Sequence, residues 1–219
     1  MSIDLVTLST ADGVELDGAL YAARALSARG AVLMIHGLTW NFYRGPSRWL
    51  PPRLADAGYT VLSLNMRDHD LAEPKDFKLS HHDIRAGVDH LAALGAGPVA
   101  IVAHGFACNK VVCYPAWSGD ARVRQIVLTT LGAVRSYRAD IWATVLQEAT
   151  GLAGRVLVVQ GAVDPLIAAA ERAGELRQAA SRAHVDVVLL EGGNHYFDGR
   201  QGELAACVVA WLAGGDHEV

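Results

Sequence analysis

The stretch PVAIVAHGFACNKVV, residues 98–112, decides the fold of this chain. Its first six residues are small or β-branched and apolar, which is typical of a strand buried on both faces of a sheet. His104-Gly105-Phe106 follows as a sharp turn, and residues 109–112 open a helix. This strand–turn–helix order predicts a nucleophile elbow, whose pattern is small-x-Ser-x-small.

Gly105 stands at the position that carries the reactive oxygen in such an elbow. The sequence therefore excludes acyl transfer through an elbow serine. Two interpretations remain open. In one, the site is degenerate and only the fold is kept. In the other, a space of roughly one water molecule lets a water or a substrate atom take the place of the serine.

Strands and helices alternate on both sides of this stretch. Apolar runs predict strands over residues 5–9, 14–21, 30–35, 59–65, 98–103, 125–130, 155–160 and 185–190. Helices are expected over residues 47–57, 80–94, 106–114, 135–149, 168–180 and 202–213, with Ser80 and Asp83 as a capping box for the second. The pattern predicts one α/β domain over residues 1–219: a mostly parallel, doubly wound sheet of about eight strands with helices on both faces. The N-terminal hairpin forms its antiparallel edge.

Composition agrees with a globular protein, because 52% of the residues are hydrophobic and 19% are charged. A net charge of −4 disfavours nucleic acid or an anionic membrane as a partner. The N-terminal residues have no signal-peptide pattern, and no apolar run reaches the ~18 residues that a membrane span needs. Three cysteines in an odd, non-metal spacing favour a cytoplasmic, disulfide-free protein without metal or cofactor.

Three further segments place polar groups just after strands. His36-Gly37-Leu38 follows the third strand, Asp164 follows the seventh and His195 follows the eighth. The carboxyl ends of parallel strands meet at one edge of a sheet, so these residues are expected to converge with the elbow. The N–H groups of Leu38 and Phe106 would form an oxyanion hole. Asp164 would orient His195, which would act as a general base.

The chain resembles the α/β-hydrolase family, in its small, cap-poor, esterase-like and lysophospholipase-like branch, over nearly its whole length. The resemblance rests on the elbow, the elbow helix at residues 109–112, and residues 36–37, 41–43, 65–70, 161–164 and 193–195. It implies hydrolysis of esters, amides or related small substrates. The chain departs from the family pattern at Gly105, at Ala107 and Cys108, and at Asp68, where Arg-Gly-His is commoner.

Other residues are expected to line or cover the site. Trp40, His104 and His69 are candidate substrate-binding residues, and residues 131–154 have room for a minimal cap of one helix. Cys108 is a less favoured substitute nucleophile, since it lies one turn into the helix and is expected to be a packed core residue.

These observations support two functions. The first is a hydrolase-like or lyase-like enzyme of altered mechanism, in which His195 activates water or moves a substrate proton. Hydrolysis, C–C cleavage, decarboxylation and cyclisation all fit this arrangement. The second is an inactive pseudoenzyme or small-molecule binding protein. In either case the expected partners are a small-molecule substrate or ligand and a second copy of the chain.

Overall fold

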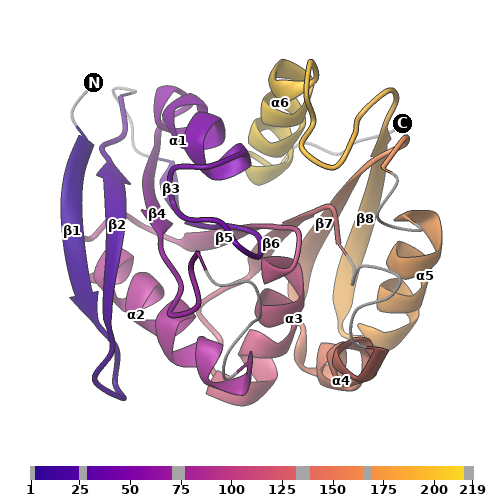
Figure 1. Cartoon of the computed structure of the whole chain (residues 1–219), viewed down its shortest axis with the longest axis horizontal. Helices are drawn as coiled ribbons and strands as arrows, with labels where there is room; N and C mark the ends of the chain where they lie inside the picture. Colours follow the sequence, from indigo (N-terminus) through magenta and orange to yellow (C-terminus); the bar gives the residue numbers. More distant parts are fainter. Residues whose placement is uncertain (1–2, 25–28, 71–76, 132–138, 165–168, 215–219) are drawn as a thin grey trace.

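The computed structural model describes residues 3–24, 29–70, 77–131, 139–164 and 169–214. Eight strands form one sheet in the order β1-β2-β4-β3-β5-β6-β7-β8 (Figure 1). The hairpin of β1 (Ile3–Ser9) and β2 (Glu15–Tyr21) pairs antiparallel, and β2 is also antiparallel to β4. All other pairs are parallel, which confirms the predicted fold class. The parallel strands are β3 (Gly30–Ile35), β4 (Tyr59–Leu64), β5 (Val99–His104), β6 (Gln125–Thr129), β7 (Gly154–Gly161) and β8 (Ala183–Leu190).

Helices cover both faces of the sheet (Figure 1). On one face, α1 (Pro46–Asp56) and α6 (Gln201–Leu212) pack on a core that includes Val102, Leu157 and Trp211. The larger core on the other face lies beneath α2 (Ser80–Ala93), α3 (Ala107–Ser118), α4 (Ala139–Glu148) and α5 (Ala169–Ala179). Short 3₁₀ turns, η1 (Phe77–Leu79) and η2 (Ala149–Gly151), adjoin α2 and α4.

Two local predictions were wrong. Ser80 and Asp83 do not form a capping box: Ser80 Oγ donates to the Phe77 carbonyl, and the Asp83 carboxylate accepts hydrogen bonds from Arg67. Helix α3 does not end near Pro115 but continues to Ser118. It stops where Gly119 adopts φ 65°, a left-handed conformation that glycine takes without steric cost.

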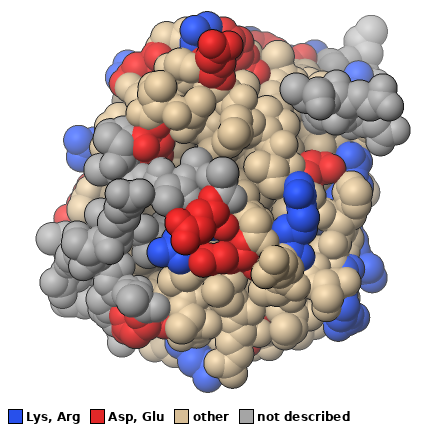
Figure 2. Space-filling model, turned by 90° about the vertical axis from the view of Figure 1, so that its right-hand side faces the viewer, with Lys and Arg blue, Asp and Glu red and all other residues tan. Residues whose placement is uncertain are grey.

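The suggested cap segment remains a prediction. In α4, Ile141, Trp142 and Val145 are buried in the larger core, but residues 132–138 lie outside the described part. None of the described helices is long and apolar enough to cross a membrane. Figure 2 shows the side of the molecule where the sheet ends at β8. Acidic and basic side chains stand next to one another in the described part of that face, without a broad area of one sign.

Candidate active site

The strand register brings the predicted site segments to one edge of the sheet. Ile35 pairs with both Leu64 and Ala103, and His104 pairs with Thr129. At the far strands, Gly161 pairs with Leu190. The loops that follow β3, β5, β6, β7 and β8 therefore leave the sheet at the same level, and their side chains meet above it.

Gly105 occupies the turn between β5 and α3 with φ 58°, and its N–H donates to the Thr129 carbonyl at 2.9 Å. A Cβ at this position would lie 3.6 Å from His195 Nε2, 3.8 Å from Gly37 Cα and 4.0 Å from Thr130 Oγ1. These are ordinary van der Waals distances. A side chain would therefore fit there and would face His195.

His195 and Asp164 are in contact, as the chain order predicts. His195 Nδ1 lies 2.9 Å from Asp164 Oδ2, and the two side chains are 17% and 0% exposed. A carboxylate can only accept, so Nδ1 carries the proton in this pair. In the neutral ring Nε2 then holds the lone pair, on the side that faces Gly105.

Gly161 positions the His195 loop at the end of β7. A Cβ there would overlap the carbonyl group of Gly193, and the Val163 N–H donates to the same oxygen at 3.0 Å. We expect Gly161→Ala to destabilise the protein by about 1–3 kcal/mol, because backbone must shift to admit the methyl group. Urea unfolding measures this loss. Gly174→Ala is the control, since nothing lies within 4 Å of a Cβ at Gly174. Equal effects of the two substitutions would contradict the prediction.

The backbone N–H groups of Leu38 and Phe106 lie on the two turns beside Gly105. Neither N–H donates a hydrogen bond within the described ranges. Phe106 is the N-cap of α3, where a helix leaves N–H groups without an intrahelical acceptor. Within the described ranges, both N–H groups are therefore without an acceptor.

His36 fixes the turn that carries Leu38. Its Nδ1 lies 2.8 Å from the Gly37 carbonyl oxygen, and its Nε2 accepts the Met66 N–H at 3.0 Å. Burial lowers the pKa of His36 to about 4, so the ring is neutral near pH 7. A neutral ring with Nδ1 protonated satisfies both contacts.

His104 lies under an aromatic cover. Trp40 stacks on His104 with ring centroids 5.5 Å apart and on Tyr196 at 5.0 Å. The His104 and Tyr196 centroids are only 6.5 Å apart, too close for the two rings to cover opposite faces of the indole. The His195 ring lies 5.3 Å from His104 and 5.0 Å from Tyr196. Trp40 and His104 therefore belong to the cluster around His195, and their role in substrate binding stays a prediction.

The hydrogen bonds of His104 face β6. Its Nδ1 lies 3.0 Å from Thr129 Oγ1 and 3.3 Å from Thr130 Oγ1, while its Nε2 is buried without a partner among the described residues. Burial, with a smaller contribution from His195, lowers the pKa of His104 to about 3. The His104 imidazole is therefore uncharged near pH 7 and lines the site next to His195.

His69 is not part of this cluster. Its ring is exposed, and its Nδ1 lies 3.0 Å from the Met66 carbonyl oxygen. Thr130 and Tyr196 are site residues that the sequence analysis did not select. Only their positions in the sequence could have indicated them. Thr130 directly follows β6, and Tyr196 directly follows His195.

Cys108 is unsuited to act as a nucleophile. Its side chain is fully buried, and Sγ lies 3.5 Å from the Ala103 carbonyl and 3.4 Å from that of Thr129. Burial raises the pKa of its thiol far above the usual range. The packed-residue interpretation therefore accounts for Cys108. In the part of the chain that the structure describes, no group of three or more His, Cys, Asp or Glu residues could hold a metal ion.

A buried ion pair lies behind the site. Lys110 Nζ is 2.6 Å from both carboxylate oxygens of Asp68, and the two side chains are 4% and 3% exposed. Lys110 belongs to the first turn of α3 and Asp68 to the loop after β4. The pair ties the elbow helix to that loop. The Asp70 N–H in turn donates to the Trp40 carbonyl at 3.1 Å.

The two buried histidines predict acid sensitivity. The pKa values of His36 and His104 are about 4 and about 3 in the folded protein, against 6.5 for an unperturbed ring. Between pH 6.5 and 4 the unfolded chain binds more protons than the folded one, so stability falls as pH falls. We expect a slope of ~2 kcal/mol per pH unit, measured by urea unfolding at pH 7, 6 and 5. His104→Asn should flatten the slope, whereas His69→Ala should not. A slope unchanged in His104→Asn would contradict this account.

The sequence matches no family model and no curated protein, but the structure resembles many solved structures. An esterase of Pyrococcus furiosus superimposes with a TM-score of 0.78 at 16% identity, covering 98% of this chain and 91% of that one. The dienelactone hydrolase of Anabaena variabilis gives 0.75 at 17% identity and 99% of both chains. An α/β serine hydrolase homologue from Coxiella burnetii gives 0.77 at 17% identity, with 97% and 98% coverage. The chain therefore has the α/β-hydrolase fold.

Proposed function

We propose that this protein is an enzyme that uses His195 as a general base on a small carbonyl substrate without a serine nucleophile. The observation that carries the proposal is the 3.6 Å between His195 Nε2 and the Cβ position of Gly105. With no side chain on Gly105, a water molecule or a substrate atom can lie against its Cα, in the space that a serine side chain would fill next to His195. It would then lie where His195 can take its proton.

In hydrolysis the steps are as follows. His195 Nε2 takes a proton from a water molecule, and the water oxygen bonds to the carbonyl carbon. The oxygen of the former carbonyl becomes negative and accepts hydrogen bonds from the Leu38 and Phe106 N–H groups. The carbonyl then re-forms as the bond to the leaving group breaks, and the leaving oxygen takes the proton from His195. Asp164 stabilises the ring while it is charged.

C–C cleavage, decarboxylation and cyclisation would use the same base and the same backbone donors. The aromatic surroundings of His195 also support a second candidate, a non-catalytic binding protein for a small molecule. That candidate accounts for Gly105 most simply, since a binding protein needs no nucleophile.

Hydrolysis of p-nitrophenyl acetate and butyrate separates the two candidates. The unmodified protein is expected to release p-nitrophenol above the buffer rate, and His195→Ala to lose about 10²-fold of that rate. His69→Ala is the matched control for adventitious histidine catalysis, because His69 is exposed and outside the cluster. If His195→Ala is as active as the unmodified protein, His195 is not the base. If the unmodified protein and both variants hydrolyse these esters no faster than buffer alone, the result would favour the binding-protein candidate.

A further inference from the structure

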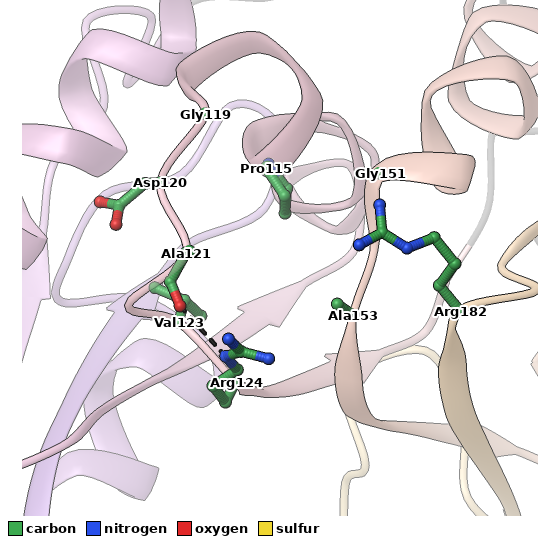
Figure 3. A pocket seen from close by; sticks show the side chains of 9 residues that line it. All are labelled: Pro115, Gly119, Asp120, Ala121, Val123, Arg124, Gly151, Ala153 and Arg182. Atoms are coloured by element: carbon green, nitrogen blue, oxygen red, sulfur yellow. Dashed lines mark hydrogen bonds between the residues drawn. The ribbon is translucent and has the colours of Figure 1, made fainter.

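A second concave site lies at the opposite edge of the sheet from Gly105. The cavity has a volume of about 210 Å³ and is lined by residues just before β6, β7 and β8, among them Arg124, Ala153 and Arg182. Figure 3 shows the lining side chains. Arg124 and Arg182 supply its charged walls, together with Asp120. Its volume is several times the ~30 Å³ that one water molecule occupies in the liquid. The cavity can therefore admit a small organic ligand.

The sheet register places the two arginines on either side of β7. Arg124 directly precedes β6, and Arg182 directly precedes β8. In the sheet, β7 lies between those two strands, so the two backbones are two strand spacings, or about 10 Å, apart. In Figure 3 both guanidinium groups extend toward the space between them, whereas the Asp120 carboxylate points away from it. One anion between the arginines can reach both.

Neither arginine has an acidic partner among the described residues. Arg182 makes no hydrogen bond or ion pair there, and Arg124 Nε donates only to the Ala121 carbonyl at 3.2 Å. The Asp120 carboxylate is already engaged, by Arg122 at 2.6 Å and by the Tyr114 hydroxyl at 2.6 Å. Two positive charges thus face one cavity, and no carboxylate of the described residues pairs with either, in a chain whose net charge is −4.

We propose that this cavity binds a small phosphomonoester. Two guanidinium groups match the charge of a phosphate dianion, and each can donate two parallel hydrogen bonds to its oxygens. Pro115, Val123 and Ala153 provide apolar wall beside them for the organic part of the ligand. The site is independent of the His195 chemistry, since it lies at the other edge of the sheet.

Binding is tested on the full chain by NMR titration at low ionic strength and pH 7.5. The probes are phenyl phosphate, inorganic phosphate and benzyl alcohol, which separate an ester from free phosphate and from the apolar part alone. We expect phenyl phosphate to shift the backbone amides of residues 119–124 and 151–153. Inorganic phosphate should shift them more weakly, and benzyl alcohol should not.

Arg124→Ala and Arg182→Ala are each expected to weaken phenyl phosphate binding roughly tenfold or more. Arg44→Ala is the matched control, because Arg44 is an equally exposed arginine remote from this cavity. Three results would overturn the proposal: no shift of these amides up to about 10 mM phenyl phosphate, equal binding of benzyl alcohol, or equal weakening by Arg44→Ala. Since no turnover is measured, the result does not depend on the proposed catalytic function.

Discussion

Replacing Gly105 with serine is expected to raise p-nitrophenyl ester hydrolysis by at least roughly 10³-fold over the unmodified protein. The Cβ of the new side chain would lie 3.6 Å from His195 Nε2 without a steric overlap. A hydroxyl oxygen one bond farther comes within hydrogen-bonding distance of Nε2 in the rotamer that faces the histidine. Asp164, His195 and the two backbone donors then complete an acyl-transfer site.

The backbone conformation at residue 105 is expected to make the serine variant less stable than the unmodified protein. Gly105 has φ 58°, a region where a non-glycine residue is strained by about 1–3 kcal/mol. Gly105→Ala is therefore the matched control: it carries the same strain and the same Cβ but no hydroxyl. Both variants should lose similar stability in urea unfolding, and only the serine variant should gain activity.

A second control separates an elbow serine from incidental activity. Gly105→Ser combined with His195→Ala should fall to the rate of His195→Ala alone, since the hydroxyl then lacks its base. If the folded serine variant shows neither an acyl-enzyme burst nor turnover, the oxyanion donors or the His195 geometry are not competent. If Gly105→Ala gains as much as Gly105→Ser, the gain does not come from a nucleophile.

The sequence could predict the fold because strand and helix patterns alternate from residue 30 onward, after an N-terminal hairpin, and parallel strands follow from that alternation. It could also predict that Asp164 and His195 converge at one edge of the sheet, whereas their contact is seen only in the structure. Asp164 and His195 lie in the loops after β7 and β8, which are neighbours in the sheet, so the topology brings both loops to one edge. The absence of a nucleophile could be recognised from the position of Gly105 in the elbow motif.

Contacts between distant side chains could not be predicted in the same way. Asp83 was interpreted as a local capping residue, but Arg67, 16 positions earlier, provides a stronger charged partner. Tyr196 has no distinguishing pattern, and its role beside Trp40 depends on how two loops fold over His104. His69 was a candidate because it is a histidine on a loop at the strand edge, but in the structure its side chain is exposed to solvent.

The ion pair of Lys110 and Asp68 is another contact that spacing does not reveal, because 42 positions separate the two residues. Lysine and aspartate usually lie at the surface, so neither position suggested a buried charge. The pair joins α3, directly after the Phe106 donor, to the loop after β4. Its removal should therefore affect both stability and the candidate site.

Lys110→Met is expected to destabilise the protein by about 3–5 kcal/mol, because it leaves the Asp68 carboxylate buried without its counter-charge. Urea unfolding at pH 7 measures the loss. Arg24→Ala is the control, since the ion pair of Arg24 and Asp56 is 40% and 57% exposed and should contribute less than about 1 kcal/mol.

The double variant Asp68→Leu with Lys110→Met should recover much of the stability, since an apolar pair leaves no buried charge unpaired. A coupling energy near zero in this cycle would show that the two residues do not interact.

In the Gly105→Ser background, Lys110→Met should also lower the esterase kcat more than it raises KM. In the proposed oxyanion role, the Phe106 N–H would act on the negative transition state and not on the neutral ester, so displacing this donor would lower mainly the rate of the chemical step. A change in KM alone would place the role of this pair in substrate binding instead.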